Sequence, residues 1–533
     1  MNHLFKDNRF LYYNAEGFRK DLIAGITVGI VAIPLGMAFA IASGVKPEYG
    51  LYTTIIAGFL VALLGGSRFQ IAGPTGAFIP ILLAIVLQYG YEDLLIAGFL
   101  AGVILVIMSY AGVSSLIHFV PKSVTIGFTA GIAIIIFTGQ LGNFFGLTGV
   151  EQKEFFHENM LGLIKQFHTV NIFSILIAVI GLAVIFILPK VAPRVPVLLV
   201  ALLIPTLISF FFFQGKIETI GTAFGGIPNS LPSFRFPEIT LSKLVALWQP
   251  ALVIAALGSI ESLLSAVVAD GMKPEKAENH NSKRELFGQG IANIITPLFG
   301  GIPATGAIAR TATNIRAGAV SPVSGFVQSF FVLGFLLLFA PYASHIPLAA
   351  MAPILMFVAW NMSARKAFIH ILSIRSGDTI VLLTTFLLTI FINLTVAVQV
   401  GILIAVISFL RKMVHKLHLK VAKTSDVEII KFGKDNPATL KKYILDGPLF
   451  FGTAKIFEDA YPVILTGDVK TIILDMEQTS VIDATGEAAL STFIDESRNA
   501  DIQIIIKKLP KEKLSLFKKG GLYEKIGEEN FFM

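Results

Sequence analysis

The chain has 533 residues, of which 54% are hydrophobic and 14% are charged, and its mean hydropathy is +0.76. Soluble globular proteins carry about 25% charged residues, so this composition excludes an ordinary soluble enzyme and indicates a chain whose apolar surface faces lipid. Residues 424–533 hold 14 Lys and Arg against 18 Asp and Glu, a net charge of −4. Because the whole chain has a net charge of +7, the first 423 residues carry +11.

Missing residues and motifs argue against several function classes. The sequence contains no Cys, which excludes disulfides, thiolate metal sites and cysteine nucleophiles. It has no Gly-x-x-x-x-Gly-Lys-Ser/Thr phosphate loop, no His-Glu-x-x-His and no Gly-x-Ser-x-Gly. We therefore expect no enzymatic activity, cofactor or metal site. No basic arm with interleaved aromatic residues occurs, so nucleic acid is not an expected partner.

Apolar stretches predict fourteen membrane segments. They fall at about 22–43, 50–66, 77–89, 94–117, 123–140, 172–188, 195–213, 246–269, 286–301, 307–318, 322–340, 348–361, 378–393 and 396–413. Basic residues precede the first stretch and no small-residue cleavage site follows it, so residues 1–21 are expected to stay as an N-terminal segment. The third and tenth stretches are too short for a full crossing, and each follows a Pro/Gly-rich sequence.

The loop charges predict the orientation. Fourteen spans place both termini on one side, where the loops hold Lys6, Arg9, Arg19, Lys20, Arg68, Lys122, Lys190, Arg194, Lys273, Lys276, Lys283, Arg284, Arg316, Arg365, Lys366, Arg375, Arg411, Lys412, Lys416, Lys420 and Lys423. The opposite side has only Lys46, Lys153, Lys165, Lys216, Arg235 and Lys243. Since cytoplasmic loops are enriched in Lys and Arg, we expect a multi-pass protein of the cell's inner (plasma) membrane with cytoplasmic N- and C-termini.

Two matching breaks predict an internal repeat. The third stretch opens with residues 70–78 and the tenth with residues 301–310, and each contains Thr-Gly-Ala shortly after a proline, at Thr75 and Thr305. The offset of 230 residues fits two inverted seven-segment repeats, at about 22–213 and 246–413, with a binding site near the bilayer midplane. A helix that starts inside the membrane presents unbonded N–H groups and partial positive charge, so two facing starts favour an anion. The alternative is that both prolines only kink packed helices.

Two ionisable residues lie well inside predicted segments. Glu261 is in the eighth, where a carboxylate should be paired, near water or protonated, and this favours a proton or coupling-ion site over a static contact between helices. Ser265 follows one turn later on the same face and either shares this site or packs helices together. Arg310 lies in the first turn of the tenth segment. It could add positive charge to the anion site, pair with Glu261, or extend to the membrane surface.

Two sequence motifs give the chain a family resemblance. Lys46 to Tyr52, followed by Gly66-Ser67-Arg68 and by Ala72 to Gly76, resembles the signature of the sulfate permease (SulP) anion transporters, and residues 301–319 resemble a second motif of that family. The family includes solute carriers that exchange sulfate, chloride and bicarbonate. The resemblance implies two intertwined repeats, a core domain that moves against a gate domain, an anion held between the third and tenth segments, and a homodimer.

The resemblance also implies roles for individual residues. The substrate-facing positions would be Thr75, Gly76, Ala77, Phe78, Ala307, Ile308, Ala309 and Arg310. Glu261 stands where sodium-coupled bicarbonate members have an aspartate, with Ser265 in place of their threonine. Their sodium-binding threonine is replaced by Ile308, which removes an oxygen ligand and favours proton coupling. Many sulfate members have Pro-Gln in the first span, and Pro34-Leu35 here weakens sulfate specifically. The chain looks most similar to proton-coupled bacterial members that carry dicarboxylates.

The C-terminal region has a different pattern. Beyond a linker at 414–423, the short apolar runs 427–432, 442–445, 471–474 and 502–506 alternate with helical stretches such as 488–498, which predicts a small α/β domain over 424–533. Residues 447–454 and 475–486 resemble the STAS domain of this family. The serine that kinases phosphorylate in soluble STAS proteins is Ala484 here, in Asp483-Ala484-Thr485-Gly486. We expect a structural or regulatory cytoplasmic module without enzymatic function.

These observations favour secondary active transport of a small anion over residues 22–413, by alternating access and with proton symport. The anion would be a dicarboxylate, bicarbonate or sulfate. An anion exchanger or channel-like conductor is an alternative, and no local sequence feature distinguishes it from proton symport. A nucleobase carrier of the same fold is a second alternative, but that family lacks the STAS tail and needs polar groups that recognise base edges.

Overall fold

A computed structural model describes residues 8–10, 13–112, 121–192, 195–273, 278–414, 417–425, 428, 432, 439–465 and 468–532. It divides into two compact units, Met1–Ile402 and Leu403–Met533. Among the residues used for the predictions, Lys6, Arg194, Lys276 and Lys416 lie outside the described residues, as do 113–117 of the fourth predicted segment and most of the predicted strand 427–432.

Each of the fourteen predicted stretches overlaps a helix. These are α1 (Ala15–Ala42), α2 (Pro47–Leu64), α3 (Ile79–Tyr89), α4 (Tyr91–Tyr110), α5 (Lys122–Gly139), α8 (Ile172–Val191), α9 (Val197–Phe212), α11 (Leu241–Met272), α12 (Ser282–Leu298), α13 (Ile308–Arg316), α14 (Val323–Ala343), α15 (Leu348–Met362), α17 (Gly377–Phe391) and α18 (Leu394–Val414). Nine helices or joined helices in the described chain are long and apolar enough to cross a membrane. The expected multi-helical membrane fold is therefore confirmed.

Short helices and early starts are features that hydropathy did not predict. The helices α6 (Leu141–Phe145), α7 (Phe156–Lys165), α10 (Ile220–Phe224) and α16 (Arg365–Ile374) and the 3-10 turn η4 (Phe167–Thr169) lie between the predicted segments. Two further 3-10 turns are η1 (Asn8–Phe10), which precedes the first segment, and η2 (Gly76–Phe78), which opens the third. Helix α1 begins seven residues before the predicted stretch, because Asn14 caps it by accepting a hydrogen bond from the Gly17 N–H. Its first turns are polar, and a hydropathy pattern cannot detect them.

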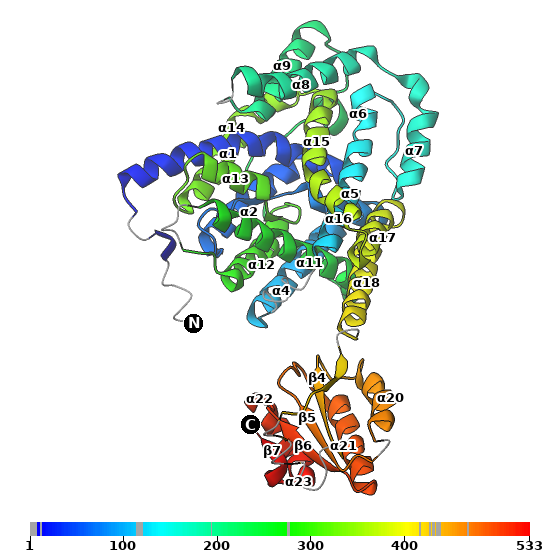
Figure 1. The fold of residues 1–533 in the computed structure, drawn as a ribbon. Coiled ribbons are helices and arrows are strands. Elements are labelled where there is room, and N and C mark those ends of the chain that lie inside the picture. The colour runs from blue at the N-terminus through cyan, green and yellow to red at the C-terminus, as the bar shows by residue number, and fades with distance from the viewer. Residues whose placement is uncertain are drawn as a thin grey trace. The chain divides into compact units, whose positions relative to one another are not determined.

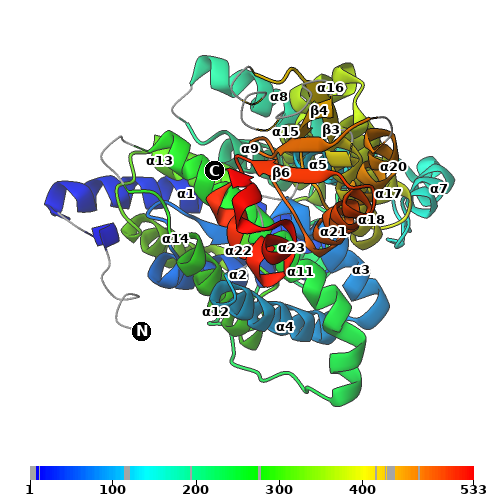
Figure 2. The ribbon, with the colours of Figure 1, turned by 60° about the horizontal axis from the view of Figure 1, so that its bottom comes forward.

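The helices of the first unit form two groups. The core group contains α1, α2, α4, α11, α12, α13 and α14, which pack on one another, and the gate group contains α5, α8, α9, α15 and α17 (Figure 1). Helix α12 lies beside α4 and α2 (Figure 2). Glycines permit this close packing: a Cβ on Gly50 would lie 1.9 Å from the Gly36 carbonyl oxygen, and one on Gly102 would lie 2.6 Å from the Ile294 nitrogen. Helix α3 contacts helices of both groups.

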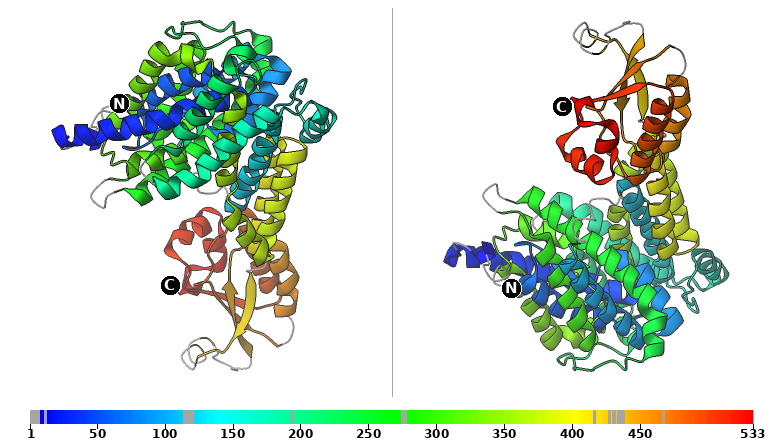
Figure 3. Two further views of the ribbon diagram at one scale, coloured as in Figure 1. Left: turned by 90° about the horizontal axis from the view of Figure 1, so that it is seen from above. Right: turned by 90° about the horizontal axis from the view of Figure 1, so that it is seen from below.

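The second unit contains a five-stranded sheet in the order β3 (His418–Ala422), β4 (Leu440–Asp446), β5 (Thr471–Asp475), β6 (Gln503–Lys507) and β7 (Phe531–Phe532). The first pair is antiparallel and the others are parallel. Helices α20 (Ala454–Ile464), α21 (Ala484–Asn499), α22 (Lys511–Lys519) and α23 (Leu522–Ile526) and the turn η6 (Glu528–Asn530) complete this unit, seen from two sides in Figure 3. The predicted runs 442–445 and 471–474 lie within β4 and β5, and 502–506 overlaps β6. The predicted α/β class is confirmed.

Candidate functional site

The two predicted breaks meet in space. Strand β1 (Ala72–Gly73) pairs antiparallel with β2 (Thr305–Gly306), with Ala72 opposite Gly306 and Gly73 opposite Thr305. Next to this ladder, the Ala307 N–H donates to the Ile71 carbonyl oxygen at 2.8 Å. The chain leaves β1 into η2 and α3 and leaves β2 into α13. Two short helices therefore begin where β1 and β2 pair, and we call this place the crossing.

Within the part of the chain that the structure describes, neither helix start has a side-chain cap. Thr75 precedes η2 and Ala307 precedes α13, both with extended backbone, and neither side chain accepts a capping hydrogen bond. Ala307 has no side-chain oxygen, and the Thr75 hydroxyl is directed to Glu261 instead of the start of η2, so within the described residues neither N-cap side chain binds the first N–H groups. Their partial positive charge is concentrated at the crossing, where an anion is favoured.

Helix α11 braces the crossing through consecutive residues. The Thr75 hydroxyl donates to Glu261 Oε2 at 2.8 Å, and Ser262 Oγ lies 2.7 Å from Thr305 Oγ1. The Gly306 N–H also donates to Ser262 Oγ at 3.0 Å. Thr75 and Thr305 occupy matching places in the Thr-Gly-Ala repeat, so each half of the chain supplies one hydroxyl to α11. Sequence reasoning missed both contacts, although the repeated threonine was the available signal.

Arg310 lies inside the protein, since only 2% of its surface is exposed. Its guanidinium donates to the Pro74 carbonyl oxygen across the crossing, and Nη1 has no hydrogen-bond partner within the described chain. Gly73 makes this position available, because a Cβ there would lie 2.5 Å from Nη1. Arg310 therefore does not extend to the membrane surface. Its bonded partner is Pro74, whereas that of Glu261 is Thr75, so the two charges attract each other across the site without being each other's hydrogen-bond partner.

The other predicted site residues differ in their surroundings. Gly76, Ala77, Phe78 and Ala307 are buried, whereas Ile308 and Ala309 are exposed. Ser265 is fully buried and donates to Thr311 Oγ1 at 3.2 Å. Thr311 Oγ1 in turn accepts from the Ile71 N–H at 3.0 Å. Ser265 thus joins α11 to α13 and to the crossing backbone, away from the Glu261 carboxylate.

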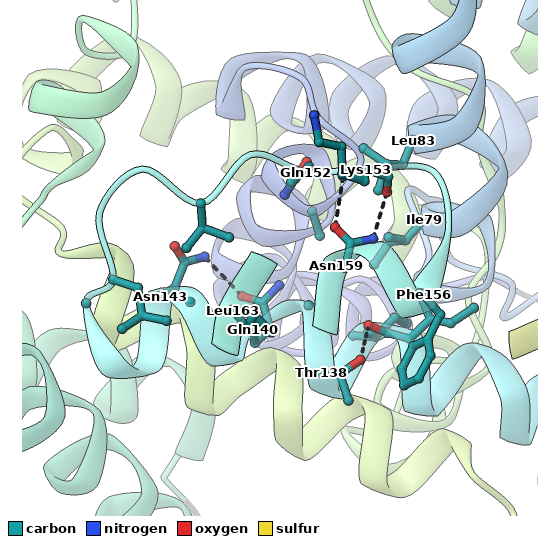
Figure 4. A pocket seen from close by; sticks show the side chains of 18 of the residues that line it. Ile79, Leu83, Thr138, Gln140, Asn143, Gln152, Lys153, Phe156, Asn159 and Leu163 are labelled. Atoms are coloured by element: carbon teal, nitrogen blue, oxygen red, sulfur yellow. Dashed lines mark hydrogen bonds between the residues drawn. The ribbon is translucent and has the colours of Figure 1, made fainter. Parts of the chain in front are cut away.

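A cavity of about 650 Å³ lies next to the crossing rather than on it. Ile79 and Leu83 of α3 line one side, and Thr138, Asn159 and Leu163 of α5 and α7 line another (Figure 4). Neither Glu261 nor Arg310 lines it. Its lining residue Ile136 reaches the site from the gate group, since a Cβ on Gly76 would lie 3.4 Å from Ile136 Cδ1. The hydrogen-bond geometry, not this cavity, locates the candidate site.

Comparison with known proteins shows which family the chain belongs to. Residues 18–385 match the sulfate permease family and residues 436–533 match the STAS domain. The chain is 51% identical over 524 residues to the putative sulfate transporter YvdB of Bacillus subtilis (strain 168), covering 98% of each chain. It is 29% identical over 546 residues to the bicarbonate transporter BicA of Picosynechococcus sp., covering 96% of this chain and 93% of that one.

Solved structures share the fold. The structure of SLC26A9 superposes with a TM-score of 0.84 at 19% identity, over 96% of this chain and 88% of that chain. The transmembrane domain of a cyanobacterial bicarbonate transporter BicA gives 0.64 at 27% identity, over 74% and 98%. The relatives YvdB and BicA are named as transporters and not as enzymes. The chain belongs to the sulfate permease family, and it is a multi-pass membrane anion transporter with a C-terminal STAS domain.

Proposed function

We propose that this protein is a secondary active transporter that carries a small anion together with a proton, and that Glu261 binds the proton. The observation that carries the proposal is the 2.8 Å bond from the Thr75 hydroxyl to Glu261 Oε2, at the point where the two broken segments cross. One carboxylate therefore contacts the residue that begins the third segment's helix. Adding or removing a proton there changes the charge beside the anion site.

The anion would bind between the starts of η2 and α13. Thr75, Gly76, Ala77 and Phe78 on one side, and Ala307, Ile308 and Ala309 on the other, would form its surroundings. The buried guanidinium of Arg310 supplies a full positive charge, and Nη1 keeps donor capacity beyond the Pro74 bond. A protonated Glu261 would remove the repulsion between its carboxylate and the anion. Loading the anion would then favour loading the proton, as symport requires.

Sodium is a less suitable coupling ion than a proton. A sodium ion needs several oxygen ligands, and Ile308 offers none where a ligand would be required. The Ser265 hydroxyl is directed to Thr311 instead of the Glu261 carboxylate. Within the described residues, no group of three or more His, Asp or Glu side chains gathers as metal ligands do.

The substrate would be a sulfate, bicarbonate or dicarboxylate anion. Relatives named for sulfate and for bicarbonate support the first two, and the resemblance to proton-coupled bacterial members supports the third. Backbone N–H groups and one Arg can donate hydrogen bonds to any of these three anions. We further propose that the protein is a homodimer in the inner (plasma) membrane, with both termini cytoplasmic and with residues 424–533 as a regulatory STAS module.

Transport into proteoliposomes tests this function. Purified protein would be supplied with labelled sulfate, bicarbonate and succinate, each with an inward proton gradient, an inward sodium gradient, unlabelled anion inside the vesicles, or none of these. We expect one anion to accumulate with the proton gradient only. Accumulation driven solely by an opposing anion would identify an exchanger, and passive equilibration would identify a channel-like conductor. Either result would contradict proton symport.

A further inference from the structure

Helix α16 (Arg365–Ile374) lies between the segments 348–361 and 378–393 predicted from the sequence, at the end of the joined helices Leu348–Ile374. It starts three residues after α15 ends and finishes three residues before α17 begins, so the chain has no room to leave the membrane surface between them. Ala364 and Arg375, which flank it, have φ of 44° and 50°, a left-handed conformation that non-glycine residues rarely adopt. These two turns set α16 apart from the helices on either side.

One face of α16 packs on the gate group. The Phe368 ring lies edge-on to Phe386 of α17 with centroids 5.1 Å apart, and the Thr379 hydroxyl donates to the Ile371 carbonyl oxygen at 2.9 Å. The helix also contacts α5. The inner face of α16 is thus fixed to the gate group by aromatic and hydrogen-bond contacts.

The opposite face combines apolar and basic side chains. Ile369 is 64% exposed and Ile374 is 55% exposed, and Arg365, Lys366, His370 and Arg375 are exposed beside them. From Arg365 to Arg375 the segment contains no acidic residue. Trp360, near the end of α15, is 49% exposed, and the Arg365 guanidinium stacks on its ring at 3.6 Å from the centroid. A face of this kind, with a Trp at its edge, is typical of helices that lie in the membrane interface.

We propose that the outer face of α16 binds an anionic lipid surface and anchors the gate group to it. The isoleucines would enter the boundary between headgroups and acyl chains, and Lys366 and Arg375 would contact the anionic headgroups. A protein partner matched only by charge would leave Ile369 and Ile374 without an apolar environment, whereas a lipid surface satisfies both features. Because α16 is joined to α17 and α5, its attachment would hold the gate group at a fixed depth while the core group moves.

The fluorescence of Trp360 can report contact with lipid, since the chain has only two Trp residues. The variant Trp248→Phe leaves Trp360 as the sole Trp. This full-length protein would be placed in bilayers of equal parts phosphatidylcholine and phosphatidylglycerol, with bromine near the top of the acyl chains of one lipid or the other. An interfacial basic residue favours anionic lipid about fivefold, so we expect brominated phosphatidylglycerol to quench Trp360 at least about twice as strongly as brominated phosphatidylcholine.

Charge removal supplies the control. Lys366→Gln combined with Arg375→Gln should bring the quenching ratio close to one and leave total quenching measurable, while Arg365 stays on the Trp360 ring. Lys122→Gln combined with Lys190→Gln, at other helix ends, should keep the ratio of the parent. Equal quenching by the two lipids in the parent, or an unchanged ratio in the Lys366/Arg375 variant, would overturn the proposal. Weak quenching by both lipids would show that protein covers this face, and would overturn it as well.

Discussion

Gly73 is the residue whose replacement should disturb the anion site with the smallest change. In Gly73→Ala the new Cβ would lie 2.5 Å from Arg310 Nη1 and 3.4 Å from Cζ. A relaxed contact needs about 3.5 Å, so the guanidinium must move by roughly 1 Å. That movement would break its bond to the Pro74 carbonyl oxygen. Hydrogen bonds from charged groups contribute about 1.5–3 kcal/mol, and misplacing the buried charge should weaken anion binding by about 10- to 100-fold.

The assay for Gly73→Ala is anion affinity in detergent, measured by calorimetry or by thermal stabilisation with added anion. Gly334→Ala is the matched control, because it lies in α14 of the core group and a Cβ there meets nothing within 4 Å. The control should keep wild-type affinity. If Gly73→Ala folds normally and binds the anion as tightly as the wild type, Arg310 does not hold the anion from its present position.

Three further predictions concern other parts of the chain. Arg310→Ala should abolish or strongly reduce anion uptake while the protein stays folded, and wild-type uptake in that variant would remove Arg310 from the site. Asp483→Ala should destabilise the STAS unit by about 1–2 kcal/mol in thermal unfolding, since Asp483 accepts from the Gly486 N–H that starts α21 and from the Phe451 N–H; an unchanged unfolding temperature would contradict this. Burial would raise the pKa of Glu428, but bonds from Lys507, Ser425 and Lys442 outweigh it and lower the pKa to about 2. The folded state has the lower pKa, so this stabilisation should be complete above about pH 4.5 and lost as the pH falls toward 2. In acid unfolding curves, Glu428→Gln should remove this pH-dependent loss of stability.

Sequence reasoning located most of the membrane helices because lipid imposes a long apolar pattern on each helix that crosses it. It also found the two breaks and the two rare charges, since Glu261 and Arg310 are conspicuous within apolar stretches. Rare charges and an internal repeat can both be read from a single sequence.

The contacts at the site were harder to predict because they depend on packing between distant residues. Thr75 and Glu261 are 186 positions apart, and their bond depends on how α11 is rotated against the crossing strands. Ser265 follows Glu261 by one helical turn, yet its hydroxyl is directed to Thr311. The pairing of β1 with β2 joins two residues from each half, too short a strand for any propensity to indicate. Helix α16 escaped notice because it has only ten residues and its Arg, Lys, His and Ser side chains interrupt the apolar run.

The central claim is that Glu261 couples the anion to a proton, and gradient-driven uptake by Glu261→Gln tests it most directly. The control is Glu92→Gln, which changes an exposed carboxylate in the first turn of α4. We predict that Glu261→Gln still binds and exchanges the anion but no longer accumulates it when an inward proton gradient is imposed, while Glu92→Gln behaves as the wild type. Unchanged accumulation by Glu261→Gln under that gradient would contradict the claim.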